Sequence, residues 1–212
     1  GLAIPGAANA IFFNAGQVCI AGSRIYAHRS VYDQVVDGVS KAASSFTLGH
    51  GLDPQTQMGP LVSRRQLDTV TGYVERATAS GATLVTGGET LPGEGAFCSP
   101  GVLVDVKQDM EIVQQEVFGP IVVCCPFDDP DEVVALANDS DYGLAASVWT
   151  ESLSRAHRLA AEIEAGTVWI NCHAMYDASL PIGGVKRSGW GRLSGQQAID
   201  NFLETKTVCA VL

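Results

Sequence analysis

The chain has 212 residues, which is enough for one substantial hydrophobic core and one main domain with an appendage. Its formal net charge is −10 and it has no Lys/Arg-rich block, which argues against a nucleic-acid-binding surface that must neutralise phosphates. No apolar run approaches the ~20 residues that cross a bilayer, and no basic segment of a signal peptide is present. We therefore expect a cytoplasmic protein with no membrane partner.

The expected elements alternate between strands and helices. Periodicity and turn residues predict strands over 24–28, 82–86, 101–106, 119–127, 146–149 and 167–170. They predict helices over 31–39 (with Ser30 as the N-cap), 63–79, 130–137 and 153–164. Such alternation predicts an α/β fold of three layers, αβα, in which helices cover both faces of a mostly parallel sheet.

The tail over 205–212 reads as an isolated apolar strand with no helix after it. From the residues alone, such a strand could close the sheet of its own domain or join a sheet of another subunit.

Six cysteines are present: Cys19, Cys98, Cys124, Cys125, Cys172 and Cys209. They show neither CxxC spacing nor a histidine at zinc-ligand spacing, so we expect no metal site. Without an export signal, reduced thiols in the cytosol are the better interpretation. Cys124 and Cys125 lie inside an apolar run and are expected to be buried small side chains.

Cys19 differs from the other cysteines because small residues surround it in Phe12–Arg24. A carbonyl carbon can approach a thiol on such a Gly-flanked loop, as a cysteine nucleophile requires. Attack on an aldehyde or ester would leave an oxyanion beside backbone N–H groups. On these residues alone, a buried and inert cysteine is equally expected.

Four segments resemble the aldehyde dehydrogenase superfamily, and they occur in the family's order. They are Phe12–Cys19, Glu116–Pro120, Gly183–Gly189 and Ala198–Lys206, with weaker matches between them. The chain is similar to the catalytic, C-terminal domain of that family over residues 1–204. In the family, the strand that corresponds to 205–212 joins a sheet across a subunit interface, which implies a homodimer or homotetramer for the full-length enzyme.

The resemblance implies an oxidoreductase that uses NAD or NADP to convert a small-molecule aldehyde to its carboxylic acid. Cys19 would be the nucleophile that forms a thiohemiacetal and then a thioester, and its own N–H would donate to the oxyanion. Glu116 would accept hydrogen bonds from the ribose of the nicotinamide, and Phe118 would flank the nicotinamide ring. From the residues alone, Glu116 is a solvated residue before a Gly-Pro turn.

The resemblance also implies a substrate pocket and a supporting loop. Asn171, Gly183 and Gly184 would support the active-site loop. The pocket residues would be Phe13, Val18, Ile20, Tyr176 and Ile182. These are apolar or aromatic, which suits an apolar or aromatic aldehyde, and 171–184 looks most like family members that oxidise phenylacetaldehyde. His173 would lie at the pocket mouth or be a solvated loop residue.

No GxGxxG or P-loop motif is present. In the family, the nucleotide-binding domain, the general-base glutamate and an oxyanion-hole asparagine all precede the nucleophile segment. The resemblance therefore implies that this chain lacks all three and is inactive by itself as a dehydrogenase. The alternatives are a CoA-acylating relative, and a non-catalytic truncated domain with only residual esterase activity.

Overall fold

The computed structural model describes residues 1–212 and has an α/β fold. Its largest sheet contains β1 (Arg24–His28), β2 (Thr83–Thr86), β3 (Gly101–Val104) and β4 (Ile121–Phe127). The strand order is β1-β4-β3-β2. The β1–β4 and β4–β3 pairs are parallel, and β2 is antiparallel to β3. The predicted α/β fold with a mostly parallel sheet is confirmed.

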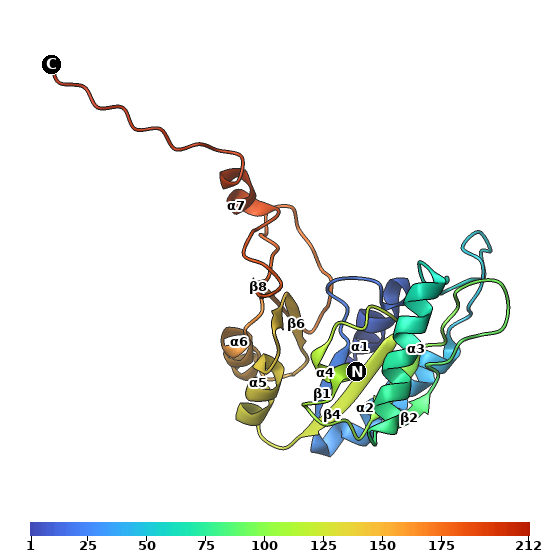
Figure 1. The fold of residues 1–212 in the computed structure, drawn as a ribbon. Helices are drawn as coiled ribbons and strands as arrows, with labels where there is room; N and C mark the ends of the chain where they lie inside the picture. Colours follow the sequence, from blue (N-terminus) through green and yellow to red (C-terminus); the bar gives the residue numbers. More distant parts are fainter.

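Helices cover both faces of this sheet. The run Ile121–Cys125 is buried at every position, although successive side chains of a strand point to opposite faces. On one face, α2 (Arg29–Ser45) contacts all four strands. On the other face lies α3 (Arg64–Ala79), whose apolar side chains join the same core (Figure 1). The core of the protein therefore sits between these helices and the sheet.

The remaining strands form two small sheets beside the main one. The strands β6 (Ala145–Val148) and β7 (Thr167–Ile170) form a parallel pair. The strands β5 (Tyr142–Gly143) and β8 (Val185–Lys186) form an antiparallel pair. The helices of this part are α5 (Pro130–Asn138), α6 (Leu153–Glu162) and α7 (Gly195–Asp200), and a short α4 (Glu111–Gln114) precedes β4. The strands thus fall into three sheets rather than one.

Polar side chains fix where the helices begin. Ser63 accepts a hydrogen bond from the Gln66 N–H at the start of α3, and Asp129 opens α5 with a capping box. The prediction that Ser30 caps α2 was wrong. His28 is the N-cap, and its imidazole accepts from the Ser30 N–H at 3.2 Å, so the helix begins at Arg29.

The periodicity did not predict the first helix, α1 (Ala3–Phe12), or the 3-10 turn η1 (Phe13–Gly16) that follows it. Pro5 lies in the first turn of α1, where a residue without an N–H loses no helical hydrogen bond. Ile11 and Phe12 are almost completely buried in the core. This packing holds the segment that leads to Cys19.

The C-terminal residues extend away from the domain (Figure 1). Residues 204–212 are exposed and form no strand, contrary to the strand predicted over 205–212. A strand exists only when a neighbouring strand pairs with it, and this chain places none beside the tail. The role of the tail in a subunit interface stays a prediction. The longest helix has 17 residues, and no helix is both long and apolar enough to cross a membrane.

Candidate active site

Cys19 occupies an exposed turn between η1 and β1. The Ala21 N–H donates to the Val18 carbonyl at 2.9 Å, which makes Cys19 and Ile20 the two central residues of a β-turn. The Gly22 N–H donates to the Ala10 carbonyl at 3.0 Å and anchors the turn on α1. The Cys19 N–H donates to no backbone carbonyl. The turn therefore offers a thiol and an unused N–H donor at one residue.

Unusual backbone angles precede this turn. Asn14 and Ala15 have φ values of 51° and 54°, which are costly for residues with a Cβ. The Asn14 side-chain amide donates to the Gln17 carbonyl, and the Val62 N–H donates to the Gln17 Oε1 at 2.8 Å. These bonds hold the strained segment in place, as is typical of functional turns.

A glycine contact brings the segment around Glu116 against the segment that leads to Cys19. Gly16 has φ +69°, and a Cβ at this position would lie 2.0 Å from the Gly119 carbonyl oxygen. Gln66 on α3 donates to the carbonyls of Val117 and Phe118 at 3.2 and 3.0 Å. The two segments that carry the predicted nucleophile and the predicted cofactor contacts are therefore neighbours.

A cavity of about 540 Å³ opens at Cys19. Val18, Ile20, Glu116, Phe118 and His173 also line it. The cavity extends between β1 and β6, each of which has a paired neighbour on one side only. Two cationic side chains line it and both are engaged. Arg24 donates to the Ala137 carbonyl, and Arg187 forms an ion pair with Asp141.

The loop after β7 is fixed by two pairs of close contacts. The Asn171 side chain accepts from the Thr150 N–H at 2.9 Å and donates to the Thr150 carbonyl at 2.8 Å. Gly183 and Gly184 lie in crowded backbone, where an added Cβ would come within 2.3 Å of the Gly191 carbonyl and 2.5 Å of the Ser188 Cβ. The support of an active-site loop by these three residues stays a prediction.

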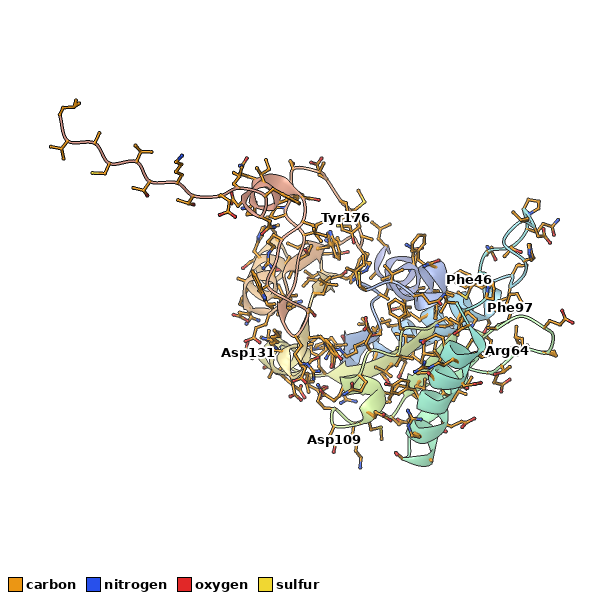
Figure 2. All side chains as sticks on the ribbon, turned by 45° about the horizontal axis from the view of Figure 1, so that its top comes forward. Phe46, Arg64, Phe97, Asp109, Asp131 and Tyr176 are labelled. Atoms are coloured by element: carbon orange, nitrogen blue, oxygen red, sulfur yellow. The ribbon has the colours of Figure 1, made fainter.

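The predicted pocket residues fall into two groups. Val18 and Ile20 line the cavity beside Cys19, whereas Phe13, Tyr176 and Ile182 are not among its lining residues. Tyr176, which is labelled in Figure 2, packs edge-on against Trp169 with 5.7 Å between ring centroids. Burial and, to a smaller extent, the nearby Cys19 raise the pKa of Tyr176. Tyr176 is half-exposed and lies outside the lining of the cavity.

Sequence reasoning missed Ser147 and left the place of His173 open. His173 is half-buried at the cavity, with one ring nitrogen 2.5 Å from the Ser147 Oγ and the other 3.0 Å from the Ile20 carbonyl oxygen. Residue spacing could not reveal these contacts because 26 and 153 positions separate the partners. No cluster of three His, Cys, Asp or Glu side chains is arranged to hold a metal ion.

The fold and this turn define an α/β domain with an exposed cysteine at a cavity. Comparison with known proteins identifies the family. The model of the aldehyde dehydrogenase family matches residues 1–208. The phenylacetaldehyde dehydrogenase of Pseudomonas fluorescens is 45% identical over 97% of this chain and 41% of its own length. The betaine aldehyde dehydrogenase of Agrobacterium fabrum is 41% identical over 97% of this chain and 42% of its own length.

A solved structure agrees with these relatives. The NAD+ complex of an aldehyde dehydrogenase from Bacillus cereus superposes with a TM-score of 0.96 at 47% identity, covering 98% of this chain and 42% of that one. The chain belongs to the aldehyde dehydrogenase family. It spans about two fifths of the length of the relatives that it matches.

Proposed function

We propose that this chain is the catalytic domain of an aldehyde dehydrogenase that oxidises an apolar or aromatic aldehyde with NAD or NADP. Cys19 is the nucleophile. One observation carries this proposal: the exposed thiol and the unused N–H of the same residue both belong to a turn at the cavity. An acyl-transfer site requires this combination, because the atom that attacks and the donor that stabilises the product charge must meet at one carbonyl.

The chemistry begins when the Cys19 Sγ attacks the aldehyde carbon. A carbon–sulfur bond forms, the thiol proton passes to water, and the carbonyl oxygen becomes negatively charged. The Cys19 N–H donates to that oxygen. The oxidation of the thiohemiacetal to a thioester is the chemistry that a bound nicotinamide cofactor supplies. Water then cleaves the thioester, which releases the carboxylic acid and restores the thiol.

Glu116 and Phe118 fit a nicotinamide nucleoside. Glu116 is exposed at the cavity, and a carboxylate can accept two O–H bonds from a ribose. Gln66 holds the backbone of Phe118, whose ring is partly exposed at the same cavity and can cover a planar ring. The Bacillus cereus relative was solved with NAD+, which supports NAD as the first cofactor to test.

The cavity favours an aldehyde without a carboxylate. Val18 and Ile20 flank the thiol, and both arginines of the cavity already have partners. A substrate carboxylate would therefore be buried without a cation, which is costly. The similarity to a phenylacetaldehyde dehydrogenase supports an aromatic substrate. We further propose reduced thiols and a cytoplasmic location, because all six cysteines are free.

The test of this function uses a chimera, because the chain matches only part of its relatives. The part of the Bacillus cereus enzyme that this chain does not cover is fused to residues 1–212. We expect NADH formation with phenylacetaldehyde, slower turnover with betaine aldehyde and succinic semialdehyde, and no turnover after C19A. Retained turnover in the C19A chimera would refute the proposal.

The CoA-acylating alternative predicts a product that depends on CoA, which chromatography of the same reaction would detect. The 212-residue chain alone is expected to form no NADH and to retain only acylation of Cys19 by an activated ester. NADH formation by this chain alone would contradict that expectation.

A further inference from the structure

His173 connects the loop after β7 to the nucleophile turn. Its Nε2 faces the Ile20 carbonyl oxygen at 3.0 Å, and a carbonyl can only accept, so Nε2 carries a proton. Burial lowers the pKa of His173, and the bond to Ile20 offsets this only in part, which keeps the ring neutral near pH 7. Nδ1 therefore accepts the hydroxyl proton of Ser147, at 2.5 Å.

Aromatic packing holds the ring in this orientation. The His173 ring packs against Trp169 with 4.8 Å between ring centroids. The Trp169 Nε1–H donates to the Met175 carbonyl at 2.9 Å, so the tryptophan is itself fixed. The imidazole is preorganised before any substrate arrives.

The hydrogen bonds from Ser147 to His173 and from His173 to Ile20 continue through the turn to Cys19. The Ile20 carbonyl and the Ala21 N–H belong to one planar peptide unit, and the Ala21 N–H donates to the Val18 carbonyl. The Val18 carbonyl and the Cys19 N–H belong to the next unit. Every bond from Ser147 to Cys19 therefore points in the same direction, and such chains polarise one another. The last donor is the unused Cys19 N–H.

We propose that Ser147 and His173 are positioning residues that orient and polarise the Cys19 N–H for binding the oxyanion. This inference rests on the proposed role of Cys19 as the nucleophile. Neither side chain contacts the reacting atoms. His173 acts on the Ile20–Ala21 peptide, which holds the Val18–Cys19 peptide through the turn.

Two reagents separate this role from a general loss of structure. p-Nitrophenyl acetate acetylates Cys19 through a tetrahedral oxyanion: a carbon–sulfur bond forms, the ester bond breaks and p-nitrophenolate leaves. Iodoacetamide alkylates the same sulfur by displacing iodide, and no oxyanion forms. A better-oriented N–H therefore accelerates acetylation and does not accelerate alkylation.

The experiment uses the 212-residue chain with H173F and H173Q as matched variants. Phenylalanine retains a ring against Trp169 and loses both hydrogen bonds, whereas glutamine can donate to Ile20 and accept from Ser147. We expect H173F to slow acetylation of Cys19 about tenfold and to leave alkylation within about twofold. H173Q should recover most of the acetylation rate, and S147A should show a smaller loss of about threefold. Peptide mapping by mass spectrometry assigns both rates to Cys19.

The outcomes distinguish the positioning role of His173 and Ser147 from the role of Cys19 as the nucleophile. Acetylation of Cys19 in the unsubstituted chain, with selective loss in H173F and recovery in H173Q, supports the inference. Equal acetylation in H173F, equal slowing of both reactions, or failure of H173Q to recover the rate overturns it while Cys19 remains the nucleophile. If Cys19 of the unsubstituted chain is not acetylated at all, this inference fails, and the NADH formed by the chimera and its C19A variant decides the proposed function separately.

Discussion

The six thiols of this chain differ in burial, and we therefore expect them to differ in reactivity. Burial raises the pKa of Cys98 and Cys124 to about 12 and that of Cys125 to about 11, so these thiols remain protonated at neutral pH. Cys19 and Cys209 are exposed. Since the thiolate is the nucleophile, exposure alone already separates the candidate nucleophile from the three buried cysteines.

We therefore predict selective alkylation of the folded chain. Iodoacetamide at about pH 8 should label Cys19 and Cys209 first and leave Cys98, Cys124 and Cys125 unmodified until the chain unfolds. Peptide mapping over time measures each rate, and a denatured sample provides the control. Labelling of Cys124 in the folded chain as fast as that of Cys19 would contradict the buried position of this strand.

His173 should make stability depend on pH. Its pKa is lower in the folded protein than in the unfolded chain, so the unfolded chain binds the proton more tightly. The contribution of His173 to the free energy of unfolding is therefore fully present above the ordinary histidine pKa of about 6.5. This contribution decreases as the pH falls below that value. We predict that H173Q reduces the loss of unfolding free energy between about pH 7 and pH 5, as measured by urea denaturation. An unchanged pH slope in H173Q would show that this ring does not contribute.

At the scale of elements, the site depends on a close approach of two backbones. Gly16 lies in η1 and Gly119 precedes β4, and their contact places the Cys19 turn beside Glu116. Only glycine permits both the positive φ and the short distance at Gly16.

We predict that G16A destabilises the chain by about 3 kcal/mol and abolishes acetylation of Cys19. The added methyl would overlap the Gly119 carbonyl, so the two segments must separate. G51A is the matched control, because nothing lies within 4 Å of its Cβ position, and it should change stability by less than ~0.5 kcal/mol. Urea denaturation measures both variants. Equal stabilities of G16A and G51A would refute the close approach.

Local patterns predicted most of the elements, and long-range contacts explain what they missed. The helix over 63–79 and the strand over 24–28 were read correctly because apolar periodicity and turn residues are local signals. The helix α1 was missed because Pro5 and Gly6 disfavour a helix, and its stability comes from packing on the core. Cys19 was found through a motif, whereas Ser147 lies in an ordinary strand, where nothing in the sequence marks its bond to His173.

For the whole molecule, the tail is the part with the fewest contacts. Val208, Val211 and Leu212 are almost fully exposed although they are apolar. The pairing of 205–212 with another subunit, which would cover these side chains, stays a prediction.

We predict that removing residues 205–212 changes the unfolding free energy of the chain by less than ~0.5 kcal/mol, because the tail packs against nothing. Self-association should weaken at the same time. Chemical denaturation and sedimentation velocity measure the two effects. A shortened chain that associates as strongly as the complete one would refute the pairing role of the tail.

The strand β1 is paired on one side only, and this affects how easily its backbone opens. Its outer edge faces the cavity, so alternate amides along it have no partner strand, whereas β4 is paired on both sides. Amide hydrogens should therefore exchange with deuterated water slowly in β4 and rapidly along the cavity edge of β1. The backbone that follows Cys19 would then open more readily than β4, and whatever covers that edge would also determine how rigidly the nucleophile is held.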